Sequence, residues 1–292
     1  MQFSNPHNIP QVLVDAMLDD DYTRGDAELS VTQLISPPRI VILQERFKHN
    51  MVVDIATRVP SLMGRVLHKI CEQYAPPEAI TEERLFATVD GMKISGAVDL
   101  QIPKPNGKWA IHDYKLTKSY AAMDEKIEWE QQLNIYAHLM SLNGREVDEL
   151  KIVAILKDWQ KKLVDVKAGY PPCQVMTIPI RLWTPEEQVN FTRSQIVNHR
   201  KAREALDKGL PIEACSETAR WVRDETWALM KEGRNAAIKL YDNPYDAEVA
   251  AAEKGDEFFV TYRPGTPTRC AGNYCGVAEF CRVWRSDPRY TP

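Results

Sequence analysis

The chain has 292 residues, of which 44% are hydrophobic and 27% are charged, and its formal net charge at pH 7 is −4. These values are ordinary for a soluble globular protein with one large domain or two modest ones, and they exclude disordered and fibrous classes. No apolar run reaches the roughly 18 residues of a membrane-spanning helix, and the first residues lack the features of a signal peptide. We therefore expect a cytoplasmic protein without a membrane partner.

The cysteines are distributed unevenly: three of the six fall within residues 270–281. In a reducing compartment such a cluster favours a bound metal over disulfide bonds. The acidic net charge is atypical of a general nucleic-acid binder. An acidic metal site contributes negative charge of its own, however, and a local basic track can coexist with it.

The N-terminal part of the chain predicts an irregular segment over residues 1–28, followed by helices. Ser30 and Gln33 have the spacing of a capping box, and Pro37-Pro38 interrupts the short helix that they begin. A second helix is expected over residues 40–47. A third is expected over residues 61–74, with one apolar stripe formed by Leu62, Val66, Leu67 and Ile70.

Strands dominate the middle of the chain. Alternating residues predict strands at 85–90, 93–102 and 108–116, then at 150–156 and 174–182, with an Asp90-Gly91 turn between the first two. A helix is expected over residues 124–142, and Thr184 with Glu187 predicts the capping box of another. The pattern predicts an α/β core over residues 29–209 and a helical subregion over residues 210–292 that carries the cysteine cluster.

Two carboxylates occupy neighbouring predicted strands. Asp99 lies near the end of one strand, and Asp113 and Lys115 lie on the next. Carboxylates on adjacent strands can converge on one hard divalent cation, and side-chain alternation places Lys115 on the same face as Asp113. The alternative is that all three are solvated polar residues at strand ends.

Two helices add candidate residues. His68 lies on the helix over 61–74, where a lone histidine is more often a satisfied polar group than a metal ligand. On the helix over 124–142, Trp129, Gln132, Leu133 and Tyr136 share one face. That face is also compatible with an ordinary amphipathic helix whose Gln132 lies at the edge of the core.

Taken in order, His68, Gly96-x-x-Asp99, Asp113-x-Lys115 and Gln132-x-x-x-Tyr136 resemble the RecB-like branch of the PD-(D/E)XK nucleases. The stretch LSVTQLISPPR is similar to the N-terminal part of that branch, and WEQQLNIYAHLM and the C-terminal tail are most similar to phage exonuclease-like members. The resemblance covers roughly residues 28–140 by motif. It implies a restriction-endonuclease-like core with a mixed central sheet flanked by helices.

The resemblance also implies roles for these residues. His68, Asp99, Asp113 and the main-chain carbonyl of Tyr114 would bind Mg²⁺ or Mn²⁺, and Lys115 would position the attacking water. Gln132 and Tyr136 would support the site or contact DNA. The implied reaction is hydrolysis of DNA phosphodiester bonds, with binding through phosphate contacts. Four candidates for such contacts, each more commonly a solvated surface charge, are Lys118, Arg200, Lys201 and Arg203.

The clustered cysteines have a counterpart in some RecB-like nucleases, which hold an iron–sulfur cluster through three C-terminal cysteines and one N-terminal cysteine. Here Pro37-Pro38 stands where the N-terminal cysteine would be expected, so Cys215 is the candidate fourth ligand. The resemblance favours a [4Fe–4S] cluster over Zn²⁺ on Cys215, Cys270, Cys275 and Cys281. Free cysteines as small buried side chains remain the alternative for this cluster, and Cys71 and Cys173 are interpreted as core or loop thiols.

Three functions compete for this chain. The first is a metal-dependent DNA exonuclease of phage-type recombination, acting with a single-strand annealing recombinase in the host cytoplasm. The second is a catalytically silent DNA-binding or assembly module with the nuclease fold. The third is an iron–sulfur redox protein. The intact Asp99, Asp113 and Lys115 favour the enzyme.

Overall fold

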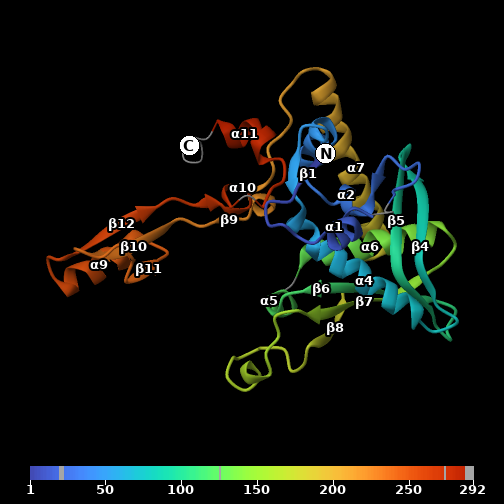
Figure 1. The fold of residues 1–292 in the computed structure, drawn as a ribbon, viewed down its shortest axis with the longest axis horizontal. Helices are drawn as coiled ribbons and strands as arrows, with labels where there is room; N and C mark the ends of the chain where they lie inside the picture. Colours follow the sequence, from blue (N-terminus) through green and yellow to red (C-terminus); the bar gives the residue numbers. More distant parts are fainter. Residues whose placement is uncertain (20–22, 125, 273, 287–292) are drawn as a thin grey trace. The chain divides into compact units, whose positions relative to one another are not determined.

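The computed structural model describes residues 1–19, 23–124, 126–272 and 274–286. The chain forms two compact units (Figure 1). The first comprises residues 1–38 and 48–210, and the second comprises residues 39–47 and 211–292.

The first unit contains most of the regular structure. Its helices are α1 (Gln11–Leu18), α2 (Val31–Leu34), α4 (Val59–Gln73), α5 (Ser119–Met123), α6 (Ile127–Leu142) and α7 (Pro185–Asp207), with 3₁₀ helices η1 (Ile55–Arg58) and η2 (Lys161–Leu163). Its strands are β1 (Gln2–Ser4), β2 (Leu29–Ser30), β3 (Val52–Asp54), β4 (Ile80–Val89), β5 (Met92–Pro103), β6 (Trp109–Thr117), β7 (Val147–Leu156) and β8 (Val175–Ile180). Helix α1 shows that the expectation of an irregular segment over residues 1–28 was wrong.

A six-stranded mixed sheet forms the centre of this unit, which confirms the predicted fold class. Strands β4 and β5 form a hairpin around Asp90 and Gly91, whose positive φ values of 48° and 74° suit a tight two-residue turn. On its other edge β5 pairs first with β2, in parallel, and then with β6, antiparallel. Strand β7 is parallel to β6, and β8 is antiparallel to β7.

Helices cover both faces of the sheet. Successive residues of a strand point to opposite faces, and on β6 Tyr114 lies edge-on to His68 of α4, whereas Lys115 contacts Gln132 of α6. Helices α4 and α6 therefore lie on opposite faces. Both predicted capping boxes are present: that of Ser30 begins α2 and that of Thr184 begins α7, which packs against α6.

Helix α4 differs from the sequence expectation in how it packs. None of its residues is buried, and Val66 and Ile70 of the predicted apolar stripe remain about half exposed. The opposite holds for α6, where nine consecutive residues, Gln132–Met140, are buried. The core of the unit therefore lies between the sheet and α6, and α4 remains partly exposed to solvent.

The second unit is not helical throughout, so the expected helical character of residues 210–292 was wrong. Its strands are β9 (Val222–Arg223), β10 (Thr226–Lys231), β11 (Lys239–Tyr241), β12 (Phe258–Arg263) and β13 (Thr266–Pro267). Its helices are α3 (Pro38–Phe47), α8 (Glu217–Arg220), α9 (Pro244–Lys254), α10 (Thr268–Ala271), η3 (Ala278–Phe280) and α11 (Arg282–Arg285). Strands β11, β10 and β12 form a three-stranded antiparallel sheet that contacts α9.

No helix in the described parts of the chain combines the length and the apolar character needed to cross a membrane.

Candidate active site

Asp99 lies where β5 separates from β6. Pairing of the two strands stops at Leu100 and His112, and beyond that point Asp99 Oδ2 accepts a hydrogen bond of 2.9 Å from the main-chain N–H of Tyr114. Asp99 is only 8% exposed. Burial, followed by the nearby charge of Asp113, raises the pKa of Asp99 to about 7. The fold thus holds the Asp99 carboxyl in a buried position, and a bound cation would favour its ionised form.

Asp113 and Lys115 form the second part of the site. Lys115 Nζ lies 2.5 Å from Asp113 Oδ2 and donates a 3.2 Å hydrogen bond to Gln132 Oε1. Gln132 Nε2 in turn donates to the hydroxyl of Tyr136 at 2.9 Å. The amide of Gln132 therefore joins the predicted lysine of β6 to the predicted tyrosine of α6.

Gly96 allows α6 to approach β5 at this point. A Cβ atom at Gly96 would lie 2.6 Å from the Tyr136 ring and 2.9 Å from Val31. Only glycine leaves room for the ring there. The glycine of the Gly96-x-x-Asp99 pattern is thus a packing residue, and the aspartate three residues later faces the site.

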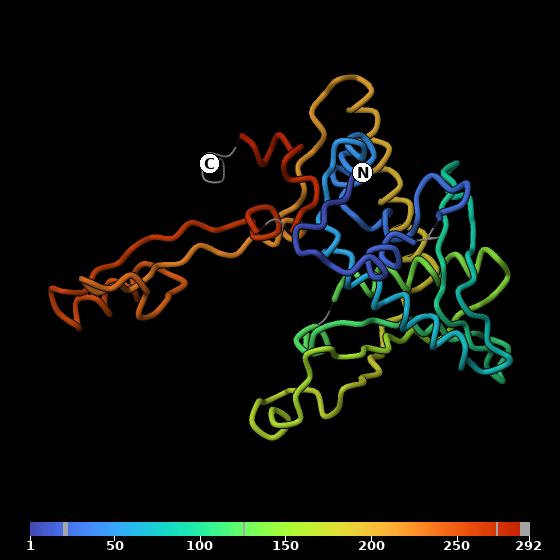
Figure 2. The backbone as a smooth tube through the Cα atoms, in the orientation of Figure 1, coloured from blue at the N-terminus to red at the C-terminus, as the bar shows by residue number. Residues whose placement is uncertain are grey.

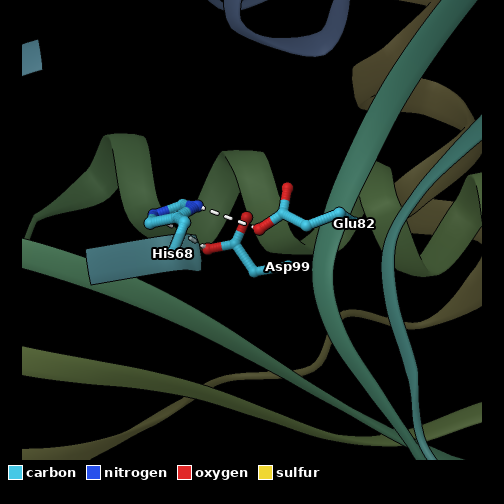
Figure 3. Close-up of side chains that lie close together, drawn as sticks. All are labelled: His68, Glu82 and Asp99. Carbon is cyan, nitrogen blue, oxygen red and sulfur yellow. Dashed lines mark hydrogen bonds and ion pairs between the residues drawn. The ribbon is translucent and has the colours of Figure 1, made fainter. Parts of the chain in front are cut away.

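His68, Glu82 and Asp99 converge from α4, β4 and β5 (Figure 3). His68 Nδ1 lies 3.1 Å from Glu82 Oε1, and His68 Nε2 lies 3.6 Å from Asp99 Oδ2. Among the described residues, these three form the only histidine, cysteine or carboxylate group whose ligand atoms all lie within 4.8 Å of one another. The hydrogen bond with Glu82 raises the pKa of His68 to about 9, although burial opposes the shift.

Glu82 was not predicted from the sequence. The register of the β4–β5 hairpin indicates its position. Val89 pairs with Met92 next to the turn, and counting seven residues back along β4 and seven forward along β5 brings Glu82 opposite Asp99. Glu82 has a φ of +50° and is left out of the ladder that pairs its two neighbours. Strained backbone of this kind is concentrated at functional sites. Glu83, by contrast, pairs with Arg145.

The donor set fits a hard divalent cation. Carboxylate oxygens with one imidazole suit Mg²⁺ or Mn²⁺. Asp113 is 1% exposed, and apart from its ion pair with Lys115 neither carboxylate oxygen accepts a hydrogen bond from the described residues. Such a buried, under-partnered carboxylate is costly unless a cation balances it. The residues that could hold the ion are His68, Glu82, Asp99 and Asp113.

An open cleft of about 960 Å³ leads to this group. Its walls include His68, Glu82 and Asp99, the basic residues Arg65 and Arg84, and the ion pair of Lys69 with Glu72. A cleft that combines arginines with carboxylates able to hold a cation suits an anionic polymer.

The four cysteines predicted to bind a cofactor surround one small cavity of about 40 Å³ in the second unit: Cys215, Cys270, Cys275 and Cys281. Arg39 of α3 donates from Nη1 to Cys281 Sγ at 3.7 Å and also donates to the carbonyl oxygens of Ile212 and Glu213. Burial, followed by the neighbouring cysteines, raises the pKa of the Cys215 thiol to about 11. Cys71 and Cys173 belong to the first unit, outside this group.

The chain matches a family model and is similar to a solved structure. A solved structure described as "Crystal structure of SSO0001" is 22% identical to this chain, covering 64% of this chain and 84% of the other, with a TM-score of 0.47. No curated protein matches the chain. A family model of the PD-(D/E)XK nuclease superfamily matches residues 13–282. The protein whose sheet brings Asp99, Asp113 and Lys115 together is therefore a member of the PD-(D/E)XK nuclease superfamily.

Proposed function

We propose that this protein is a metal-dependent deoxyribonuclease of the RecB-like branch that hydrolyses DNA phosphodiester bonds. The observation that carries the proposal is the convergence of His68, Glu82 and Asp99 at the base of an open cleft, beside the Asp113–Lys115 pair. A redox protein or a silent assembly module has no need of a lysine paired with a buried carboxylate beside a group of potential metal ligands.

Each group has a distinct task in the proposed reaction. A divalent cation at the carboxylate cluster supplies Lewis-acid stabilisation of negative charge on the scissile phosphate. Asp99 is oriented by the N–H of Tyr114, and Glu82 orients the ring of His68 through Nδ1, so that Nε2 faces the same point as Asp99. The main-chain carbonyl of Tyr114 is proposed as a further ligand.

Lys115 is proposed to orient the attacking water and to stabilise the charge that develops on the phosphate. Its ammonium is held between Asp113 and the amide oxygen of Gln132, so it does not have to reorganise during the reaction. Tyr136 fixes the amide of Gln132 through its hydroxyl. Gln132 and Tyr136 therefore act on the reaction by holding Lys115.

The mode of cleavage and the biological setting belong to the same proposal. The similarity of WEQQLNIYAHLM to phage exonuclease-like members supports an exonuclease of phage-type recombination, working with a single-strand annealing recombinase in the host cytoplasm. The arginines in the walls of the cleft support DNA as the ligand.

We further propose that Cys215, Cys270, Cys275 and Cys281 hold a structural [4Fe–4S] cluster. In the described structure the four cysteines line one small cavity, which supports a shared site. The resemblance to RecB-like nucleases with a C-terminal cysteine cluster favours iron–sulfur over zinc at this site.

Incubation with end-labelled linear DNA and circular DNA, with Mg²⁺ or Mn²⁺ and with a chelator, tests the enzymatic proposal. We expect cleavage that requires the cation and a free end, and loss of cleavage in a folded Asp113→Asn variant. Asp148→Asn is the matched control, because it neutralises an acid of β7 that is paired with Lys104. Equal cleavage by wild type and Asp113→Asn would refute the assignment. Cleavage of circular DNA would refute the exonuclease mode alone.

A further inference from the structure

One lysine-rich surface is not used by the catalytic machinery. It is formed by Lys118, between β6 and α5, and by the segment of residues 157–174 between β7 and β8. Five exposed lysines belong to it: Lys118, Lys157, Lys161, Lys162 and Lys167. Strands β6 and β7 are parallel, and their C-terminal ends are neighbours because Thr117 pairs with Leu156. Both parts of the surface therefore begin at the same end of the sheet. Figure 2 shows the 157–174 segment projecting beyond the ends of these strands.

The segment is attached firmly at the end of the catalytic strand. Lys157 N donates to the carbonyl oxygen of Thr117 at 2.9 Å, and Asp158 Oδ1 accepts from both N and Oγ of Ser119 at 2.6 and 2.9 Å. The buried Tyr170 accepts through its hydroxyl from the main-chain N–H of Gln160 at 2.9 Å. These contacts pre-order the surface, which lowers the entropic cost of binding a ligand.

The lysines of this surface outnumber its acids, because the 157–174 segment contains only Asp158 and Asp165. Asp158 lies near Lys118 but its Oδ1 accepts hydrogen bonds from Ser119, and no ion pair within 4 Å joins any of the five lysines to a carboxylate in the described parts of the chain. Lysines elsewhere on the same sheet are paired: Lys104 lies 2.8 Å from Asp148 and Lys108 lies 2.5 Å from Glu146. An excess of lysines on a pre-ordered surface attracts polyanions.

The position of this surface relates it to the active site. Lys115 precedes Thr117 by two residues, about 7 Å along a strand, so the surface begins a few nucleotides from the scissile phosphate. The cleft reaches the site at His68, Glu82 and Asp99, and it is also lined by Tyr136, which contacts Gln132 beside Lys115. A DNA strand that leaves the cleft across Asp99 and Lys115 would therefore meet Lys118 and the 157–174 segment.

We propose that these five lysines bind the phosphate backbone of the DNA substrate on the Lys115 side of the active site. The surface would bind without reading sequence, because ammonium groups contact phosphates as point charges. This inference rests on the proposed nuclease function and adds a second binding surface to the cleft.

The experiment measures DNA affinity at several salt concentrations in the presence of a chelator, which prevents cleavage. The variant is Lys161→Gln/Lys162→Gln, and the control is Lys104→Gln/Lys108→Gln, which removes the same charge from ion-paired positions. For a duplex, the slope of log affinity against log salt should become shallower by about 1.8 in the variant, since each lost phosphate contact contributes about 0.9. The control should keep the wild-type slope. A second variant, Lys118→Gln/Lys157→Gln, should lose slope in the same way.

The outcomes separate this inference from the function on which it rests. If wild type binds and cleaves DNA but both lysine variants keep its slope, the surface is not a phosphate contact and the inference alone fails. If the control loses as much slope as the variants, the effect is one of overall charge and the inference also fails. If wild type neither binds nor cleaves DNA, the proposed function fails and this inference fails with it.

Discussion

At the scale of single residues, Lys115 has two partners that hold its ammonium, Asp113 and Gln132. Because the group is fixed before substrate arrives, its contribution belongs to the transition state more than to binding. We expect Lys115→Ala to lower kcat by about 10²- to 10³-fold, with a much smaller change in DNA affinity. Single-turnover cleavage and metal-free DNA binding measure the two effects. Lys104→Ala, at an ion-paired position on β5–β6, should change neither.

If Lys115→Ala weakens binding and turnover by the same factor, the lysine is a phosphate anchor and its proposed catalytic task is wrong.

Asp99 and His68 give the site a defined pH dependence. Their pKa values in the metal-free protein, about 7 and about 9, both lie above the ordinary values. The folded metal-free state therefore binds protons more tightly than the unfolded state, so its free energy of unfolding should fall as pH rises from about 4 through 9. Cation binding competes with these protons and should weaken by up to about tenfold per pH unit between 9 and 7, where His68 is protonated, and by up to about a hundredfold per unit below 7, where Asp99 is protonated as well.

Thermal unfolding from pH 5 to pH 9, with chelator and with Mn²⁺, measures this dependence. The cation should restore stability at the alkaline end, where Asp99 and Asp113 repel each other. Asp99→Asn should flatten the metal-free profile between pH 4 and 7. A profile that keeps its slope in Asp99→Asn would show that the dependence arises elsewhere.

At the scale of elements, the contact between β5 and α6 joins fold and site. The Tyr136 ring occupies the space that a side chain at position 96 would need. Gly96→Ala should therefore lower the free energy of unfolding by about 1–3 kcal/mol, as overpacking of a full core does. It should also lower kcat, because Tyr136 holds Gln132 and Gln132 holds Lys115.

Gly64→Ala is the matched control for this prediction. A Cβ atom at Gly64, within α4, meets no atom within 4 Å. Replacing a mid-helix glycine by alanine should raise stability by up to about 1 kcal/mol. Chemical denaturation of both variants compares them, and equal stability changes would show that the approach of α6 to Gly96 is not tight.

At the scale of the whole molecule, the cysteine site belongs to the second unit and the catalytic residues belong to the first. Cys270→Ser should lower the content of bound metal at least about tenfold. Even the loss of a residue that only hydrogen-bonds a metal ligand lowers metal affinity by about that factor. Stability of residues 211–292 should fall first and activity only as a consequence. Metal analysis, visible absorbance and limited proteolysis measure these effects. Cys173→Ser, at an exposed thiol of the first unit, is the control.

Stoichiometric zinc in a colourless protein would correct the identity of the metal. Protein purified without oxygen that holds neither iron nor zinc would refute the site.

Sequence alone determined the elements whose signals are local. The capping boxes of Ser30 and Thr184, the Asp90-Gly91 turn and the strands β5 and β6 are present as predicted, because neighbouring residues decide caps, turns and strand faces. The same alternation placed Asp113 and Lys115 on one face. The motif order was sufficient to indicate the superfamily that the family model shows.

Tertiary structure decided what depends on residues far apart in the chain. Glu82 reaches His68 and Asp99 through strand register and a strained backbone, and neither its type nor its immediate neighbours mark it out. Leu62 of the apolar stripe of α4 packs against the cluster of Val14, Met17 and Ile55, but Val66 and Ile70 remain about half exposed, because periodicity states that a face is apolar but not how much of it is covered. Residues 226–263 form a sheet with α9 because pairing partners, not local propensity alone, make a strand.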